Sequence, residues 1–533
     1  MLRTNIDFYR KWGTVYEIIY IQINMVNKSN KSNKSLHTAV IAVLNTLVSG
    51  IVSLFVTRLI ILNYGSDFNG LNATANQLIA MLLIVEGGFT LATNVALFKP
   101  LAINDYSKIN EILSATRNNF FKIGSFVFLL GLIVTIGFSY IILTPLPRTF
   151  IFMVFLMTLI STVFNLIYTT KFQILLQSSQ REYIIHYTKL ISNIAAQAFV
   201  VMIIMKNGDM LLIRFIIMIF SIFNGVLISI IAKKEFKFID FQVSPDYEAI
   251  KGTKDIFIQK ITAMIYGTAP ILFISAFSGT AYASVYAVYN SIFSILKSAI
   301  YSFVNAPRMS LGQLITEEKS NNVIKVLNEY EFVVVYVLLT LLSTTAVLIM
   351  PFIGIFTNGI NDINYDNWGI ALLLVAITYF EIIHIPSGNT INMSGSFKVG
   401  RKIQSVSCIV LVVLILIGKN FGIYGILGSI LITAILLAIL EIIYVHKFYF
   451  SDGLVGFFKI LLPLSVASVF IIIIEIILLP EISSYSSFFL LGAIIVTING
   501  LLLAGVSYMT NRNLIKSTYE RITRIFMRIR YKN

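Results

Sequence analysis

Apolar runs about twenty residues long recur along almost the whole chain, with short polar connections between them. About twenty apolar residues in a helix span the hydrocarbon core of a bilayer. The strict apolar–polar alternation of a transmembrane barrel strand is absent from these runs. The pattern predicts an all-α integral membrane protein with about fourteen transmembrane helices. They are expected at residues 36–63, 71–97, 120–143, 149–170, 188–205, 211–232, 255–277, 284–306, 329–356, 367–391, 403–418, 423–445, 457–479 and 488–510.

The two ends of the chain are amphipathic rather than continuously apolar. In residues 1–35, Phe8, Trp12 and Tyr16 recur at helical spacing before a repeated Asn-Lys-Ser linker. This segment is either a helix on the membrane surface or an extension in front of a natural start at Met25. In residues 511–533, isoleucine and arginine alternate with a helical period. This pattern favours a basic helix on an anionic leaflet, with a disordered basic tail as the alternative.

An internal repeat divides the chain into two halves at a constant offset of 214 residues. Apolar residues before the third predicted helix fall on apolar residues before the ninth: Leu97, Leu101, Ile109, Ile112 and Leu113 on Leu311, Ile315, Val323, Val326 and Leu327. Each set predicts a short amphipathic helix in a loop on one side of the membrane. The expected organisation is two parallel, pseudo-symmetric six-helix lobes around a central cavity, since parallel repeats place the substrate path at their interface.

The domain boundaries follow from this repeat. An N-lobe of helices 1–6 is expected at 36–232, and a linker at 233–254 joins it to a C-lobe of helices 7–12 at 255–450. Two extra helices at 451–510 and the basic tail at 511–533 complete the chain.

Composition and charge fix the class and the orientation. The 533 residues are 57% hydrophobic and 12% charged, with a mean hydropathy of +0.85, which excludes a soluble domain. The net charge of +15 does not indicate nucleic-acid binding, because the lysines and arginines are scattered among loops rather than gathered on one face. Most lie in one alternate set of loops, so the positive-inside rule places that side and both termini in the cytoplasm.

Charged residues inside apolar helices are costly and normally face a protein interior or a watery cavity. They are Arg58, Glu86, Lys297, Glu381 and His384. Glu86 and Lys297 lie at matched depths, and the repeat offset maps Glu86 one turn from Lys297. We expect them to be close, either as a structural ion pair or as a substrate-binding pair. Arg58 lies nearer the outer end, where it snorkels to the interface or binds a substrate phosphate.

Glu381 and His384 are three residues apart, share a helix face, and form either a local hydrogen-bonded pair or a site that passes protons or binds a coupling cation. Gly and Pro inside the helices are candidate hinges or sites of packing accommodation. These residues are Gly87, Gly88, Pro270, Pro351 and Pro386.

The sequence offers no signature of metal or cofactor chemistry. Cys408 is the single cysteine, which excludes a disulfide within the chain, and no metal-binding cluster or nucleotide-binding loop is present. No catalytic residue, metal or cofactor is therefore expected. Transport would draw on an ion gradient of H⁺ or Na⁺, or on consumption of the product outside.

Several segments resemble polysaccharide-export flippases of the Wzx type, within the multidrug/oligosaccharidyl-lipid/polysaccharide exporter superfamily. They are RLIILNYGSDFNGLNATANQL at 58–78, LLIVEGGFTLATNVALFKPLA at 82–102, KFQILLQSSQREYI at 171–184, YASVYAVYNSI at 282–292, PFIGIFTNGINDINY at 351–365 and IPSGNTINMSGSFK at 385–398. The chain departs from the family at Ala269 and Pro270, where relatives often carry an acid, and in the eleventh helix. Roles at those positions do not transfer.

The resemblance implies export of an undecaprenyl-diphosphate-linked oligosaccharide, such as an O-antigen or capsule unit, across a bacterial cytoplasmic membrane by alternating access. Membrane lipids and the polymerase and chain-length machinery are the partners it implies. A multidrug or metabolite antiporter and a lipid-II-type flippase of the same superfamily are alternatives. A membrane glycan-modifying enzyme is the alternative from another class, and the short outer loops weigh against it.

Overall fold

The computed structural model describes residues 41–530 apart from 43, 47, 87–88, 251–253 and 317–319. These residues fold into helices without a strand, which confirms the all-α prediction. Ten helices in the described ranges are long and apolar enough to cross a membrane, and two shorter ones are apolar. One of the ten, Phe397–Tyr449, folds back on itself as two antiparallel helices. The segment expected at 1–35, the hinge candidates Gly87 and Gly88 and the last three residues lie outside the described residues.

The first half of the chain contains seven labelled helices after an initial helix, Leu44–Tyr64. They are α2 (Ser66–Leu82), α3 (Phe89–Ile103), α4 (Tyr106–Ile141), α5 (Arg148–Phe164), α6 (Thr170–Ser178), α7 (Tyr183–Met205) and α8 (Met210–Glu235). A 3₁₀ turn, η1 (Leu83–Glu86), follows α2, and a π-helical turn, η2 (Asn165–Thr169), joins α5 to α6.

The second half contains ten labelled helices. They are α9 (Lys254–Phe277), α10 (Thr280–Thr316), α11 (Ser320–Phe356), α12 (Trp368–Ile383), α13 (Ile385–Met393), α14 (Phe397–Gly418), α15 (Gly422–Ile443), α16 (Val455–Leu478), α17 (Tyr485–Thr510) and α18 (Arg512–Arg530). A short 3₁₀ turn, η3 (Lys419–Phe421), precedes α15, and a second π-helical turn, η4 (Tyr444–Tyr449), extends it.

Two sequence expectations about helix boundaries are wrong. The span expected at 71–97 is two helices, because the chain tightens into the 3₁₀ turn at Leu83–Glu86. The amphipathic connections expected as separate short helices are instead the end of α3, with 15 residues, and the ends of three long helices: α4 has 36 residues and α10 and α11 have 37 each. Their apolar stripes continue past the bilayer-spanning length, so neighbouring helices stay packed beyond it.

The repeat appears in the backbone as well as in the sequence. Gly65 and Gly279, which are 214 positions apart, both adopt positive φ, 85° and 102°, which glycine tolerates without steric cost. Helix α2 begins directly after the first and α10 directly after the second. The five apolar residues of each set also have matching burial: four are buried and one is partly buried, at the same position in both sets.

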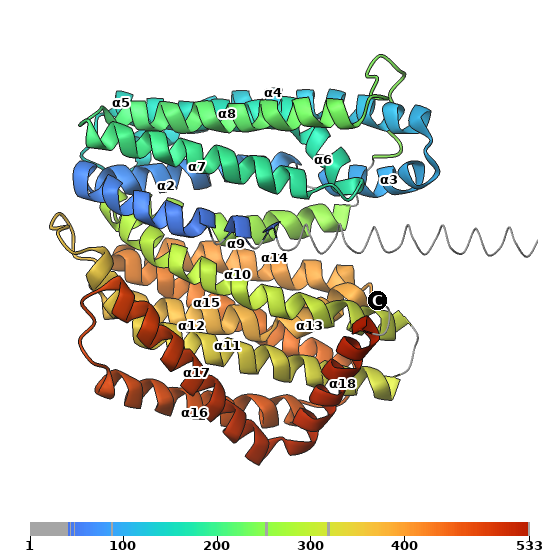
Figure 1. Cartoon of the computed structure of the whole chain (residues 1–533), viewed down its shortest axis with the longest axis vertical. Helices are drawn as coiled ribbons and strands as arrows, with labels where there is room; N and C mark the ends of the chain where they lie inside the picture. The colour runs from blue at the N-terminus through green and yellow to red at the C-terminus, as the bar shows by residue number, and fades with distance from the viewer. Residues whose placement is uncertain are drawn as a thin grey trace, which may run out of the picture.

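The helices form two groups that lie side by side (Figure 1). The initial helix and α2–α8 form the first lobe, and α9–α15 form the second, with α16 and α17 packed outside it against α11. Helix α18 packs against α11 and α17. One end of the bundle holds Gly65, Gly279 and the loops 142–147 and 357–367, and we call it the contact end. The other holds the loop 236–250 and the start of α18, and we call it the basic end.

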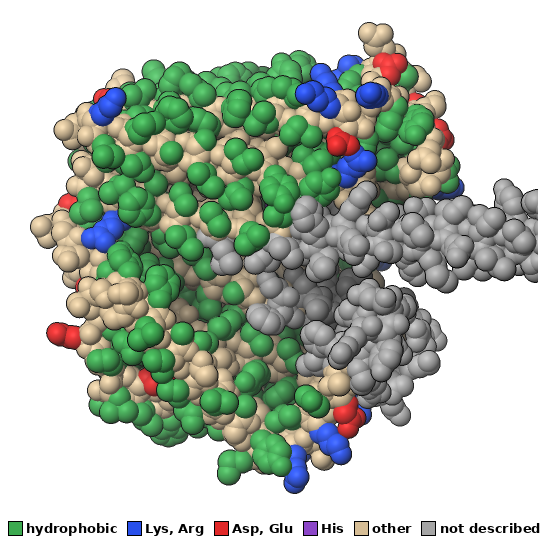
Figure 2. Space-filling view, in the orientation of Figure 1, with side chains coloured by type: hydrophobic (Ala, Val, Ile, Leu, Met, Phe, Trp, Pro, Cys, Tyr) green, Lys and Arg blue, Asp and Glu red, His purple; other side chains and the backbone are tan. Residues whose placement is uncertain are grey.

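Apolar side chains cover the flanks of the bundle in Figure 2, whereas most charged side chains lie near its two ends. Ile133 is 69% exposed, Ile409 64% and Leu501 70%. An apolar surface of this extent is stable against lipid tails and not against water. The chain is therefore a multi-pass membrane protein.

Candidate substrate path and ion-binding cavity

The two lobes meet most closely where α2 crosses α10, at the contact end. Gly70 permits this crossing: a Cβ atom on Gly70 would lie 1.8 Å from the carbonyl oxygen of Thr280. Real Cβ atoms do not approach backbone so closely, so a side chain here would force the two helices apart. The first helix also reaches the second lobe, where Gly50 faces Ile295 of α10.

A polar network holds the contact end closed. Asn69 donates to the hydroxyl of Ser284 at 2.7 Å, and Thr280 donates to Asp67. Ser66 donates through its backbone N–H and its hydroxyl to Asp362, at 2.6 and 2.9 Å.

The phenol of Tyr365 lies at the centre of this network. Its oxygen is 2.7 Å from the Ser66 hydroxyl and 2.8 Å from that of Ser284. Because Ser66 belongs to the first lobe and the others to the second, these hydrogen bonds cross the lobe interface. Each net hydrogen bond contributes about 1 kcal/mol, so the network is strong enough to bias a closed state and weak enough to open.

Arg58 belongs to the same closure. Its guanidinium donates to the hydroxyl of Tyr485 at 2.9 Å and to the carbonyl oxygen of Asn358 at 3.3 Å. Both acceptors lie at the contact end of the second lobe. In this conformation the Arg58 side chain therefore takes part in a contact across the lobe interface. The phosphate-binding role suggested by the sequence stays a prediction for another conformation.

Contacts between the lobes are concentrated on few elements. In the described ranges, the labelled elements that pack closely across the interface are α2 and η1 on one side and α9 and α10 on the other. Towards the basic end, α3 packs on α4 and α6 of its own lobe. The interface is thus joined at the contact end.

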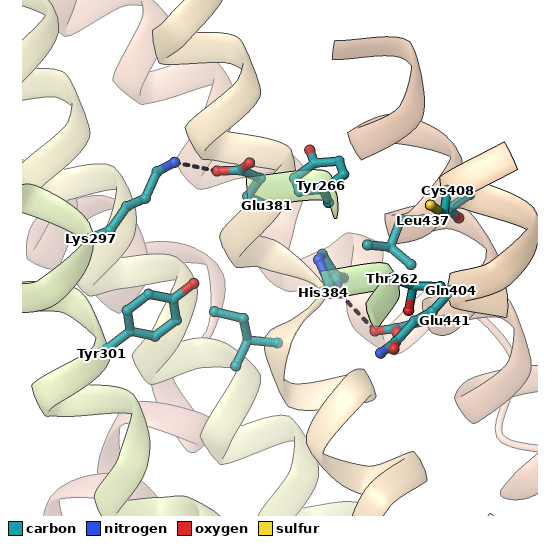
Figure 3. A pocket seen from close by; sticks show the side chains of 12 residues that line it. Thr262, Tyr266, Lys297, Tyr301, Glu381, His384, Gln404, Cys408, Leu437 and Glu441 are labelled. Atoms are coloured by element: carbon teal, nitrogen blue, oxygen red, sulfur yellow. Dashed lines mark hydrogen bonds and ion pairs between the residues drawn. The ribbon is translucent and has the colours of Figure 1, made fainter. Parts of the chain in front are cut away.

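A cavity of about 330 Å³ lies inside the second lobe, among α9, α10, α12–α13, α14 and α15 (Figure 3). Two charged pairs face it. Lys297 of α10 lies 2.5 Å from the carboxylate of Glu381 on α12. His384 Nδ1 lies 2.7 Å from the carboxylate of Glu441 on α15. Each pair therefore joins two helices through the cavity wall.

The backbone explains why His384 points into this cavity. Helix α12 ends at Ile383 and α13 begins at Ile385, with Pro386 in its first turn, so His384 occupies the break between them. A single helix over 367–391 was expected, and the structure interrupts it because Pro386 lacks the N–H that would continue the ladder. Gly388 leaves room for the acid: a Cβ atom there would lie 2.5 Å from Glu441 Oε2.

The cavity is rich in oxygen atoms and in acidic groups. The side-chain oxygens Gln404 Oε1 and Ser407 Oγ are buried in its wall without a hydrogen-bond partner. Among the described residues that line it, two carboxylates, Glu381 and Glu441, face one lysine, so acidic groups outnumber lysine and arginine there. Such a site suits a proton or a small monovalent cation, either of which would neutralise it.

The expected ion pair between Glu86 and Lys297 is not formed in this conformation. The structure describes both residues, and no ion pair joins them: Lys297 contacts Glu381 instead. Glu86 lies at the end of the 3₁₀ turn η1 and accepts a hydrogen bond from Thr90. Glu381 and Glu86 are at similar depths by sequence, but the helix that carries Glu381, α12, packs directly on α10. Glu381 therefore contacts Lys297.

The other predicted residues have mixed outcomes. Glu381 and His384 do share the cavity, but each pairs with a different helix and not with the other. Glu441, which the charged residues named from the sequence do not include, is buried in the cavity wall. Pro270 and Pro351 lie inside uninterrupted helices, α9 and α11, so their hinge role stays a prediction.

Sequence reasoning missed Glu441 because α15 continues through a π-helical turn to Tyr449, which carries the acid away from the helix end. It also missed Gln404 and Ser407, which look like ordinary polar residues of an amphipathic helix.

Comparison with known proteins identifies the fold. No protein-family model matches the chain, and no curated protein matches it in sequence. Among solved structures, the lipid II flippase MurJ in an inward closed conformation aligns with a TM-score of 0.67 and 16% identity, over 89% of this chain and 99% of that one.

Two structures of a multidrug resistance MATE family transporter, in different conformations, also align. An inward-facing structure gives a TM-score of 0.58 at 10% identity, over 75% of this chain and 96% of that one. An outward-facing structure gives a TM-score of 0.52 at 10% identity, over 77% and 94%. The chain therefore has the fold that the lipid II flippase shares with the transporters of the multidrug/oligosaccharidyl-lipid/polysaccharide exporter superfamily.

Proposed function

We propose that this protein is a flippase that moves an undecaprenyl-diphosphate-linked oligosaccharide from the inner to the outer leaflet of a bacterial cytoplasmic membrane. The observation that carries the proposal is the interface between two repeat-related lobes, which is closed at one end by Gly70 and a polar network. A closure of this kind opens and shuts by rocking of the lobes. Opening each end in turn would give alternating access to a path between them.

The basic end is assigned to the cytoplasm, together with both termini, by the positive-inside rule. In this orientation the described conformation is closed towards the outside. The lipid-linked substrate would then enter between the lobes from the inner leaflet. The resemblance of segments such as 58–78 and 385–398 to polysaccharide-export flippases supports a polysaccharide repeat unit rather than lipid II as the substrate.

The cavity of the second lobe is the site proposed for ion coupling. A proton on His384, or a cation among Glu381, Glu441 and the free oxygens of the wall, would balance the excess of acidic groups. Because α10 carries both Lys297 and the crossing with α2, a change in the Lys297–Glu381 contact is transmitted along one helix to the closure. Ion binding and lobe movement are thus joined by α10.

A multidrug antiporter is the second candidate, because the aligned MATE transporters share the fold and an acidic cavity in one lobe would serve a cation antiporter equally well. The two functions differ in substrate. Efflux of cationic dyes from cells that express the protein supports the antiporter; export of a surface glycan supports the flippase.

The proposal is tested in a strain that lacks the protein. Complete lipid-linked repeat units should accumulate on the cytoplasmic leaflet, and a plasmid copy should restore surface polysaccharide. A matched plasmid copy carrying Gly137→Ala, at a helical glycine with open space around it, should restore it equally. Accumulation of truncated or unmodified repeat units would instead identify a glycan-modifying enzyme and overturn the proposal.

A further inference from the structure

A second cavity, of about 310 Å³, lies in the first lobe near the basic end, away from the lobe interface. We propose that it binds the phosphate headgroup of an anionic phospholipid from the adjacent leaflet. Its wall combines residues of α4, the π-helical turn η2, α6 and the loop 236–250. The residues that carry the argument are Arg117, Phe121, Lys122, Tyr168, Lys171 and Tyr247.

Three cations line this cavity without an acid to balance them. No carboxylate of the described ranges forms an ion pair with Arg117, Lys122 or Lys171, although nearby Lys108 and Arg181 each have one. Lys171 is only 7% exposed. Burying an ammonium group without a counter-ion costs free energy. We therefore expect the contact with the Lys171 ammonium group to contribute most of the affinity of an anion that enters the cavity.

The local backbone is built around Lys171. Its ammonium group donates to the carbonyl oxygen of Ile167, 3.0 Å away, within the π-helical turn. It also lies 5.3 Å from the ring centre of Phe172 and 5.9 Å from that of Phe241, a residue of the loop 236–250. The carbonyl oxygen of Ile167 accepts from one of the three N–H donors of the ammonium group, so the other two can donate to phosphate oxygens. Single π-helical turns within a helix are frequently found at functional sites.

The surroundings favour a lipid over a soluble anion. Phe121 is 57% exposed and Tyr168 is 53% exposed, and both line the same cavity. An apolar and aromatic rim of this kind would lie against acyl chains, with Tyr168 at the level of the headgroups. Basic pockets on the cytoplasmic side between transmembrane helices suit anionic headgroups.

The bound lipid would also touch the segment that connects the lobes. Tyr247 accepts a hydrogen bond from Asn118 at 3.2 Å, and its ring lies 5.9 Å from the ammonium group of Lys122. A headgroup between Lys122 and Lys171 would therefore hold α4, α6 and this segment together. The inference concerns a regulatory lipid and does not depend on the identity of the transported substrate.

The test uses the purified full-length protein and native mass spectrometry with phosphatidylglycerol or phosphatidylcholine of identical acyl chains. The wild-type protein should retain phosphatidylglycerol preferentially. Arg117→Gln with Lys122→Gln should weaken that binding about tenfold or more, since each basic residue near an anionic lipid contributes roughly one kcal/mol. The matched control, Lys398→Gln with Lys447→Gln, removes two exposed lysines outside the cavity and should leave binding unchanged.

Substitutions of Lys171 provide an independent test of the lipid site. Lys171→Met should weaken phosphatidylglycerol binding, and Lys171→Arg should retain it. Equal losses in the pocket variant and the control would show general surface attraction and overturn the proposal, as would unchanged binding in the pocket variant. If soluble diphosphate displaced the lipid from the wild type and not from the pocket variant, the site would serve a free phosphate ligand and the lipid assignment would be wrong.

Discussion

At the scale of single residues, Lys297 and Glu381 offer the sharpest test of the cavity. Their side chains are 22% and 18% exposed, so either charge alone would be left in a poorly hydrated place. We expect Lys297→Met or Glu381→Gln to destabilise the protein by about 2–3 kcal/mol, somewhat less than for a fully buried pair. The yield of monodisperse protein after detergent extraction, and its thermal unfolding, measure this loss.

The double change separates structure from transport. Lys297→Met with Glu381→Gln removes both charges and should recover abundance, because no uncompensated charge remains. Transport should stay lost if the pair moves during the cycle. Lys398→Met, at an exposed lysine, is the control and should have no effect. Recovery of transport in the double variant would show that the pair only holds α10 to α12.

His384 and Glu441 are expected to couple transport to an ion gradient. Glu441→Gln removes the carboxylate that contacts His384, while a hydrogen bond at that position is kept. The transport rate should then be nearly the same with and without a proton or sodium gradient. Rates in proteoliposomes with and without each gradient measure this. Glu475→Gln, which alters a contact with Asn499 outside the cavity, should retain the wild-type response to the gradient; the same response in Glu441→Gln would contradict the assignment.

At the scale of helices, the crossing of α2 and α10 depends on Gly70. Gly70→Ala places a Cβ atom 1.8 Å from a backbone oxygen that cannot move aside, so the contact end should be held open. Spin labels at Asn63 and Asn361, in a Cys408→Ser background, should report longer distances than in the unsubstituted protein. Gly137→Ala, where nothing lies within 4 Å, should leave the distances unchanged. Unaltered distances in Gly70→Ala would show that this crossing does not control closure.

A second prediction at this scale concerns the loop 236–250, which is strapped to α4 by contacts with Lys108, Asn110 and Ser114. Lys108 lies 2.7 Å from Asp246, and this contact lowers the pKa of Asp246 below its ordinary value of 3.8. The stabilisation is therefore present at neutral pH and is lost as the pH falls below 3.8 through the lowered pKa. Asp246 and Glu111 together raise the pKa of Lys108 above 10.5, so the strap persists in moderate alkali.

Hydrogen exchange of residues 236–250 measures this strap. Exchange should rise in acid below that value, after correction for the intrinsic rate, and Asp246→Asn should show the faster exchange already at neutral pH. Asp240→Asn, at another acid of the same loop, leaves the contact with Lys108 in place and should match the wild type at neutral pH. Protection that stays the same in Asp246→Asn would mean that the backbone contacts with Asn110 and Ser114 hold the loop alone.

At the scale of the whole molecule, periodicity and the repeat were sufficient for the architecture. Apolar runs predict where the helices lie, and the 214-residue offset predicts which helices of the two halves correspond, so the two lobes could be predicted from the sequence. The contacts between individual charged side chains could not. Depth in the membrane gives one coordinate of a side chain, and both Glu86 and Glu381 share the depth of Lys297, so only the packing of α12 on α10 decides between them.

Local departures of the backbone from regular α-helix account for the other differences between the predicted and the observed sites. The break at His384 and the π-helical extension of α15 bring His384 and Glu441 together, and neither follows from hydropathy. The 3₁₀ turn at Leu83–Glu86 likewise places Glu86 beside Thr90 rather than within a continuous helix. Lys297, Glu381 and His384 line one cavity, and the geometry that brings them together comes from helix packing rather than from the sequence pattern.

The most direct test of the account is transfer of a lipid-linked oligosaccharide across proteoliposomes that contain only this protein. Substrate placed in the inner leaflet should become accessible to a membrane-impermeant glycosidase, faster with a proton or sodium gradient than without one, and Gly70→Ala should abolish the transfer. No transfer above that of protein-free vesicles, in preparations that do transport cationic dyes, would contradict the flippase assignment.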